Sequence, residues 1–230
     1  QKNYLMCDYA LFPNTFTRDV FMKDYMLENL YKGEIVLADY PRNMALLDKE
    51  KSDALRSKLG LSDKKLIAYM PTWRGLGRSA NGASQKEILE GIFKKLDAQL
   101  SDEEIFYVNL HFLIGNTMDF SNYQHIKPFP SEYETYDFLA LCDMLVTDYS
   151  SVFFDFAITK KKIVLFTYDL EEYMRDRGTY FPIENLPFPM VCSVDELMKE
   201  IHTSGKTCDY HEFLSQYHAF ADKQTPAMLL

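Results

Sequence analysis

Residues 144–181 of this chain, MLVTDYSSVFFDFAITKKKIVLFTYDLEEYMRDRGTYF, contain the pattern that decides the fold. An apolar run at Met144–Val146 is followed by a short polar loop, a segment with helical spacing and a second apolar run that ends at Phe166. Apolar strands separated by helices are typical of the parallel sheets of α/β proteins. The stretch therefore predicts one strand–loop–helix–strand unit of such a sheet.

The same alternation continues on both sides of this stretch, with a main body over Lys65–Phe166. We predict a Rossmann-like parallel sheet with helices on both faces, in a domain over residues 61–230. Residues 1–60 are interpreted as the remnant of an N-terminal domain plus a linker. Further strands are predicted at Asp8–Phe12, Glu34–Ala38, Lys65–Met70 and Ile105–Leu110, and helices at Thr17–Tyr31 (capped by Thr17), Leu46–Leu59 (closed by Gly60), Gln85–Leu100, Tyr136–Cys142, Asp195–His202 and Tyr210–Ala221.

The composition is that of an ordinary globular protein with an acidic balance. Of 230 residues, 47% are hydrophobic and 26% are charged, which suffices for a sizeable core. A formal net charge of −9 argues against non-specific nucleic-acid binding and against a broad basic membrane-binding face. The four cysteines form no C-x-x-C pair, so we expect reduced cytosolic thiols. The chain begins with Gln and ends in an apolar stretch, and we expect it to be a fragment of a longer protein.

The loop TDYSS, residues 147–151, lies where a buried strand passes into a helix. Free N–H groups at a helix start, together with the hydroxyls of Ser150 and Ser151 and the nearby Thr147, form a candidate phosphate site. An ordinary helix cap by one of the serines is the alternative. Asp155, one helical turn further on, is placed to reach a ribose hydroxyl or serves only as a first-turn acid favoured by the helix dipole.

Two further segments supply candidate anion and substrate contacts. After the strand that ends at Met70, the sequence PTWRG places the only tryptophan, Trp73, beside Arg74. Arginine suits phosphate through paired charged hydrogen bonds, and tryptophan either stacks on a base or packs. Arg42, directly after a proline, is a second candidate anion contact or a linker residue.

His111 follows the strand predicted at Ile105–Leu110. At the carboxyl end of a strand it faces the ligand side of a parallel sheet, where it could act as acid, base or phosphate donor; a satisfied core histidine is the alternative. The spacing of His, Asp and Glu indicates no metal site. The motifs G-x-x-x-x-G-K-[ST], G-x-G-x-x-G and G-x-S-x-G do not occur, which weighs against three common α/β enzyme classes.

Five motifs occur in an order seen in one known family. They are YPRN at 40–43, MPTWR at 70–74, LH at 110–111, LVTDYSSVFFD at 145–155 and FTYDLEEYMRDRGTY at 166–180. Together they resemble the CDP-glycerol glycerophosphotransferases that polymerise wall teichoic acid or decorate capsular polymers in bacteria. The likeness covers roughly residues 35–185 and implies the carboxyl-terminal, nucleotide-binding half of a two-domain GT-B architecture.

The resemblance implies a role for each matching residue. Thr147, Ser150 and Ser151 would hold the CDP diphosphate, with Arg74 near the phosphates, and His111 would match the active-site histidine of the second domain. Arg42, Trp73 and Arg177 also lie in matching motifs and are candidate substrate contacts. Asp155 is a candidate nucleotide contact.

The reaction implied is transfer of glycerol phosphate, or a related polyol phosphate, from a CDP-activated donor to an acceptor hydroxyl, with release of CMP. No cofactor is expected beyond the donor. A polymer or lipid-linked acceptor, a missing N-terminal domain and a cytoplasmic location, with peripheral association at the inner face of the membrane, are further expectations; nucleic acid is not an expected partner.

Two departures from the family pattern qualify these expectations. The family's first-domain motif, His-Gly followed shortly by Lys, supplies the catalytic base and does not occur here, and His111 is followed by Phe112 where the family usually has proline. We therefore expect these residues alone to bind nucleotide weakly and not to turn over. A GT-B glycosyltransferase using a sugar nucleotide and a non-catalytic module of a capsule assembly complex are the alternatives.

Overall fold

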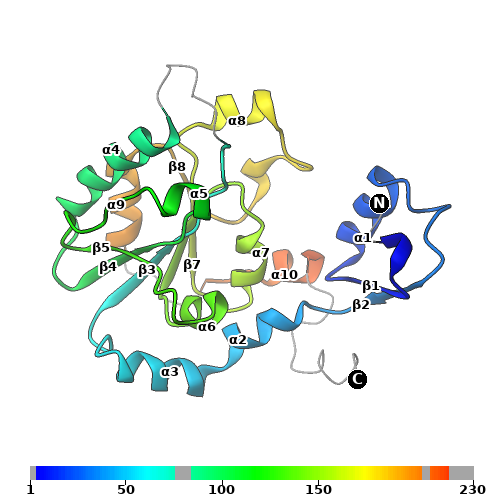
Figure 1. Ribbon diagram of the computed structural model, residues 1–230, viewed down its shortest axis with the longest axis horizontal. Coiled ribbons are helices and arrows are strands. Elements are labelled where there is room, and N and C mark those ends of the chain that lie inside the picture. The colour runs from blue at the N-terminus through cyan, green and yellow to red at the C-terminus, as the bar shows by residue number, and fades with distance from the viewer. Residues whose placement is uncertain (1–3, 76–83, 204–207, 218–230) are drawn as a thin grey trace.

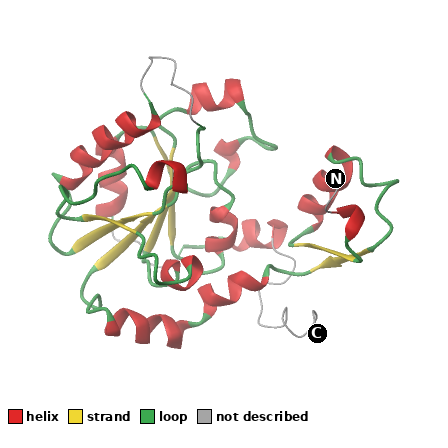
Figure 2. Ribbon diagram, in the orientation of Figure 1, coloured by secondary structure: helices red, strands yellow, loops and turns green. Residues whose placement is uncertain are grey.

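A computed structural model describes residues 4–75, 84–203 and 208–217 (Figure 1). Strands and helices alternate along most of the chain (Figure 2), which confirms the predicted α/β class. The elements are β1 (Tyr9–Phe12), α1 (Thr15–Asp24), β2 (Glu34–Leu37), α2 (Met44–Leu47), α3 (Lys49–Lys58), β3 (Lys65–Tyr69), α4 (Gln85–Asp97), β4 (Glu104–Val108), α5 (Phe112–Gly115), β5 (Ile126–Pro128), α6 (Thr135–Leu139), β6 (Met144–Thr147), α7 (Val152–Ala157), β7 (Lys162–Phe166), α8 (Leu170–Asp176), β8 (Met190–Val191), α9 (Val194–His202) and α10 (His211–Tyr217), with 3₁₀ turns at Tyr4–Met6, Pro41–Asn43 and Ile183–Asn185.

The central sheet has six parallel strands in the order β5-β4-β3-β6-β7-β8. The chain starts in the middle at β3, runs outward through β4 to β5, returns to β6 beside β3 and then runs outward the other way. The strand order therefore reverses between β3 and β6. In open parallel sheets ligands bind at such a switch point, beyond the carboxyl ends of the strands.

Two apolar cores cover the two faces of this sheet. On one face α4 and α9 pack against alternate side chains of the strands, including Ile67, Phe106 and Val164. On the other face α2, α6, α7 and α10 bury the intervening side chains, including Leu66 and Leu145. Because strand residues alternate between faces, continuous apolar strands such as these require helices on both sides, and Figure 1 shows this layering.

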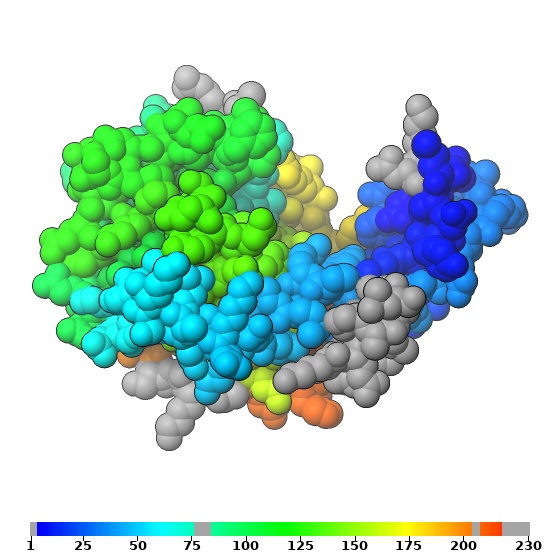
Figure 3. Space-filling view, turned by 60° about the horizontal axis from the view of Figure 1, so that its bottom comes forward, coloured from blue at the N-terminus to red at the C-terminus, as the bar shows by residue number. Residues whose placement is uncertain are grey.

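A small lobe, residues 4–38, stands apart from the main sheet (Figures 1 and 3). Its strands β1 and β2 form a separate parallel pair, and its own core contains Phe12, Leu27 and Tyr31. The lobe contacts the main body where the side-chain amide of Asn14 donates to the carbonyl of Tyr217. It carries many of the exposed large apolar side chains of the described chain: Leu5, Met6, Tyr9, Tyr25, Met26, Leu30 and Ile35.

The segment between the small lobe and β3 packs against the main sheet domain. Helix α3 is fixed to it by Ser52 Oγ, which donates to the carbonyl of Ala140, and by Arg56, which pairs with Asp143 at 2.8 Å. Leu46, at the end of this segment's first helix, lies in the core of the main domain. Residues 41–58 therefore share the main domain's packing rather than that of the small lobe.

Several predicted elements differ from those observed. The single helix expected over Leu46–Leu59 is two helices, because the side chain of Asp48 accepts from the N–H of Lys51 and starts α3. The first helix is capped by Asn14, whose side chain accepts from the N–H of Thr17, and not by Thr17 as predicted. The predicted end at Gly60 is confirmed by its φ of +67°, which suits glycine. The strands β5 and β8 are two to three residues long and were too short for the apolar pattern to predict.

Candidate functional site

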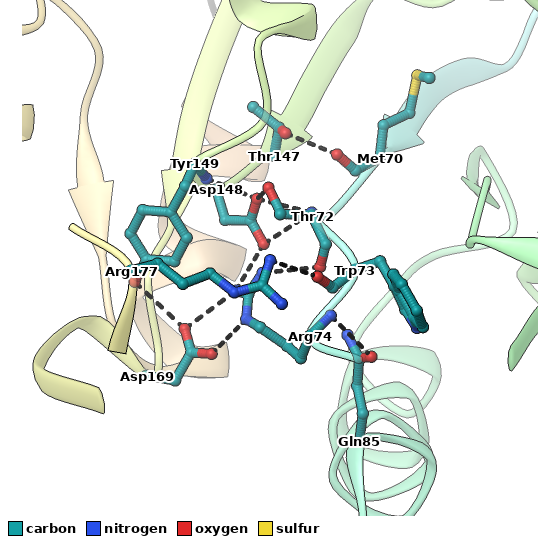
Figure 4. A network of polar contacts seen from close by, with 10 residues as sticks. All are labelled: Met70, Thr72, Trp73, Arg74, Gln85, Thr147, Asp148, Tyr149, Asp169 and Arg177. Carbon is teal, nitrogen blue, oxygen red and sulfur yellow. Dashed lines mark hydrogen bonds and ion pairs between the residues drawn. The ribbon is translucent and has the colours of Figure 1, made fainter. Parts of the chain in front are cut away.

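The two loops that flank the switch point are joined by one buried carboxylate, Asp148 (Figure 4). Asp148 follows β6, and its side chain is fully buried. It accepts from the backbone N–H of Thr72 at 2.8 Å and from the Thr72 hydroxyl at 2.8 Å, so the loop after β3 is held to the loop after β6. Burial raises the pKa of Asp148 above its ordinary value, although Arg74 and the donors from Thr72 oppose this shift.

Arg74 is the centre of the network at this edge. Its Nε donates to Asp169 at 2.6 Å, one terminal nitrogen donates to Asp148 at 2.7 Å, and the other donates to the carbonyl of Thr72. Burial alone would lower the pKa of Arg74, but the hydrogen bonds and charges of Asp169 and Asp148 outweigh it and raise that pKa above its ordinary value. The guanidinium is therefore a permanent cation that holds three loops together.

Two tyrosine rings close this network from one side. Tyr149 and Tyr173 stack with centroids 3.7 Å apart, and the guanidinium carbon of Arg74 lies 5.0 Å and 5.1 Å from the two centroids. The hydroxyl of Tyr149 donates to Asp169 at 3.2 Å. Cation–π contacts of this kind stabilise a desolvated guanidinium. The arrangement ties the beginning of α8 to the TDYSS loop.

The three hydroxyl residues predicted to bind phosphate lie in two environments. The hydroxyl of Thr147 is buried and donates to the carbonyl of Met70 at 2.7 Å, so it links β6 to the end of β3. Ser150 is half-buried and Ser151 is exposed, and Ser151 precedes α7 without a side-chain cap hydrogen bond. Among the residues that the structure describes, neither serine hydroxyl has a hydrogen-bond partner. Both are available to a ligand.

Asp155 and Arg42 form a second network, distinct from that of Arg74. Arg42 donates to Asp155 Oδ2 through two nitrogens at 3.1 Å and 3.0 Å, and the hydroxyl of Tyr136 donates to the same oxygen. The guanidinium carbon of Arg42 lies 4.3 Å from the ring centroid of Tyr40. Two predicted ligand contacts thus engage each other, and one oxygen of the Asp155 carboxylate, Oδ2, already accepts from both Arg42 and Tyr136.

His111 and Trp73 meet face to face. Their ring centroids are 4.4 Å apart with an angle of 11° between the planes. His111 Nδ1 accepts from the N–H of Leu113 at 3.5 Å at the start of α5. Arg177 donates to the carbonyl of Trp73 at 3.1 Å (Figure 4). The structure thus brings Arg74, Trp73, His111 and Arg177 to the same edge of the sheet.

Sequence reasoning missed Asp169, Tyr149 and Tyr173 as members of the site. Asp169 follows β7 by three residues, which is the position from which polar side chains reach the ligand edge of a parallel sheet. That position is the signal that could have identified it. The stacking of Tyr149, in the loop after β6, on Tyr173, within α8, has no counterpart in the sequence pattern.

The described residues contain neither a metal-binding cluster nor a membrane-spanning helix. No group of three or more His, Cys, Asp or Glu side chains in this part of the chain is placed to hold a metal ion. No helix within it has the length and apolar character to cross a membrane.

Comparison with known proteins identifies the relatives of this chain. A family model described as CDP-glycerol:poly(glycerophosphate) glycerophosphotransferase matches residues 1–227. The teichoic acid poly(glycerol phosphate) polymerase of Staphylococcus epidermidis is 32% identical over 94% of this chain and 30% of its own length. The enzyme of the same name from Bacillus spizizenii is 30% identical over 89% of this chain and 52% of its own length.

Solved structures show the same likeness. The wall teichoic acid polymerase TagF superposes with a TM-score of 0.76 at 28% identity, over 96% of this chain and 56% of that one. A variant of TagF soaked with CDPG superposes with a TM-score of 0.75 at 30% identity. The chain thus spans about a third to a little over half of the length of the relatives that it matches.

Proposed function

The chain belongs to the CDP-glycerol:poly(glycerophosphate) glycerophosphotransferase family, and we propose that it is the donor-binding half of a two-domain GT-B transferase. The enzyme would transfer glycerol phosphate, or a related polyol phosphate, from a CDP-activated donor to a teichoic-acid or capsule-type acceptor. The observation that carries this proposal is the pair of free hydroxyls on Ser150 and Ser151 beside the switch point. Polar donors at this place in a parallel sheet are positioned for a diphosphate.

The neighbouring residues support the serines in different ways. Thr147 is proposed to shape the loop, since its hydroxyl is committed to Met70. Arg74 is proposed to lie near the phosphates and to hold their loops, since its nitrogens are engaged by Asp148 and Asp169. For Asp155 the geometry favours a structural role over a ribose contact, because the side chain is buried and its Oδ2 already accepts from Arg42 and Tyr136. Arg42 accordingly supports the site from a distance.

The proposed reaction is an in-line displacement at the β-phosphorus of the donor. A bond forms between the acceptor oxygen and phosphorus, the bond from phosphorus to the bridging oxygen breaks, and CMP leaves with that oxygen. Positioning and stabilisation of charge at phosphorus account for most catalysis of this kind. His111 is proposed to face the reacting phosphate, and no cofactor is used. The proton of the acceptor hydroxyl is taken by a base from the domain outside these residues.

The small lobe is proposed to belong to that other domain. A two-stranded parallel sheet is not stable by itself, and this one exposes Tyr9 and Ile35 on its strands. The full protein would act at the cytoplasmic face of the membrane, on a polymer or lipid-linked acceptor.

Titration of CDP and CDP-glycerol into the full-length protein tests the proposal. We expect Ser150→Ala and Ser151→Ala each to raise the Kd for CDP about tenfold or more, because each removes a hydrogen bond to a charged group. Ser215→Ala, on the surface of α10, is the matched control and should leave the Kd unchanged. Unchanged binding in both site variants would contradict the proposal. Turnover of UDP- or CMP-sugars in place of CDP-glycerol would favour a glycosyltransferase, and absence of nucleotide binding a non-catalytic module.

A further inference from the structure

We propose that Trp73 is a positioning residue that holds the imidazole of His111 for the transfer step, and that it does not stack on the donor's base. This inference rests on the proposed function, because it assigns His111 to the reacting phosphate. It reverses the simplest interpretation of a tryptophan in a nucleotide site, which is that the indole receives the base.

The stack itself is the first argument. The two rings are nearly parallel, at 11°, with centroids 4.4 Å apart, so one face of the indole is covered by the imidazole. The ring of Phe112 lies 4.6 Å from the imidazole on a tilted plane. Stacked rings resist rotation of the smaller ring about its side-chain bonds. A base could not use the indole face that His111 already occupies.

The hydrogen bond of the imidazole sets which nitrogen serves the reaction. Nδ1 of His111 accepts from the N–H of Leu113 at 3.5 Å, a long contact that favours the neutral tautomer with its proton on Nε2. The indole then decides where that nitrogen points, since the backbone bond alone leaves the ring plane free to turn. Together the two contacts favour one tautomer and restrict the orientation of the imidazole.

The backbone of Trp73 is itself rigidly held. The preceding residue, Thr72, is bonded to Asp148 through its N–H and its hydroxyl, and the following residue, Arg74, is paired with two carboxylates. The carbonyl of Trp73 accepts from Arg177. The indole packs against the core on the α4 face of the sheet. The position of His111 therefore depends on the loop after β3, which carries the only tryptophan in the chain.

Steady-state kinetics and CDP titration on the full-length protein test this inference with four variants: Trp73→Ala, Trp73→Phe, His111→Ala and the Trp73→Ala/His111→Ala double variant. We expect Trp73→Ala to lower kcat about 10- to 100-fold while the Kd for CDP changes less than about twofold, because only the placement of a reacting group is lost. Trp73→Phe, which keeps a stacking ring, should recover most of the rate. The double variant should be no slower than His111→Ala, since Trp73 acts through His111.

Two results would overturn the inference while leaving the proposed function intact. One is a raised Kd for CDP in Trp73→Ala at unchanged kcat, which would show that the indole receives the base. The other is a double variant that loses the product of the two single losses. Denaturation midpoints identify any variant that fails to fold, in which case Trp73→Phe and Trp73→Leu carry the comparison. If the wild-type protein neither binds CDP nor turns over CDP-glycerol, the proposed function fails, and this inference fails with it.

Discussion

Two arginine networks in the main domain use the same chemical parts in different surroundings. Arg74 pairs with Asp148 and Asp169 and lies against Tyr149 and Tyr173, and its side chain is 15% exposed. Arg42 pairs with Asp155, contacts two tyrosine rings as well, and is 47% exposed. An arginine, a carboxylate and tyrosine rings thus occur once at the switch point and once where the 3₁₀ turn at 41–43 meets α7.

The two networks differ in how far water can solvate a charged group whose partner has been removed. Water reaches the half-exposed guanidinium of Arg42, and the buried carboxylate of Asp155 also accepts from the hydroxyl of Tyr136, so we expect this pair to contribute less than a fully buried one. At the switch point the carboxylate of Asp148 is fully buried, and loss of its partner leaves a charge that water does not reach. We therefore expect the Arg42–Asp155 pair to stabilise the fold modestly and the Arg74–Asp148 pair to be required for its stability.

The largest expected effect is that of Arg74→Ala. It leaves the buried Asp148 and the largely buried Asp169 without a cation, and removal of one partner of a buried pair costs about 3–5 kcal/mol. Chemical denaturation measures the lowered free energy of unfolding. A loss of less than about 1 kcal/mol, typical of a surface pair, would show that the two networks are equivalent.

Arg42→Ala is the matched substitution and should cost about 1 kcal/mol in the same measurement. Asp155 keeps the hydrogen bond from the hydroxyl of Tyr136 after the arginine is removed. The exposed guanidinium contributes mainly through that carboxylate and the ring of Tyr40. A cost equal to that of Arg74→Ala would remove the distinction drawn from burial.

Removal of one tyrosine hydroxyl from each network should give a smaller difference in the free energy of unfolding. Tyr136→Phe removes one of the two side chains that donate to Asp155, and should cost about 1–1.5 kcal/mol. Tyr149→Phe removes one donor from Asp169, which retains two hydrogen bonds from Arg74, and should cost about 0.5 kcal/mol. Chemical denaturation of the two variants in parallel measures both losses. A larger loss in Tyr149→Phe than in Tyr136→Phe would contradict the prediction.

The smallest effect concerns pH. Burial raises the pKa of Asp148 in the folded protein, so the folded state holds its proton more tightly than the unfolded state. This contribution to stability is present below pH ~4 and is lost as the pH rises through the raised pKa. The advantage of the wild type over Asp148→Asn should therefore shrink between pH ~4 and 7, while Arg74 stays charged throughout. Parallel denaturation of the two proteins checks this, and a difference that grows with pH would refute it.

Much of the fold was predictable from local pattern. Strands such as β3, β6 and β7 are apolar on both faces, and their separation by helices predicts a parallel sheet whichever residues finally pair. The short strands β5 and β8 were not predicted, because two or three residues are too few to show a periodicity. The break between α2 and α3 at Asp48 was not predicted either, since a capping residue within an apolar repeat cannot be distinguished from any other polar position.

The candidate site was predictable in position but not in its contacts. Thr147, Ser150, Ser151, Arg74 and His111 were all placed at the carboxyl edge of the sheet by their position after strands. The engagement of Thr147 with a carbonyl and of Asp155 with Arg42 was not predictable, because a hydroxyl or carboxylate in a sequence shows no partner.

The sequence by itself determined the α/β class, the order of the motifs and the place of the serine pair between a strand and a helix, since these depend on neighbours within a few residues. Only the tertiary structure decided that Arg74 meets Asp169, 95 positions further along the chain, and that Trp73 covers His111. Both contacts follow from the strand order, in which β3 lies between β4 and β6 and β7 lies next to β6. Pairing of strands far apart in the chain brings their carboxyl ends together, and no local spacing records which side chains will then lie in contact.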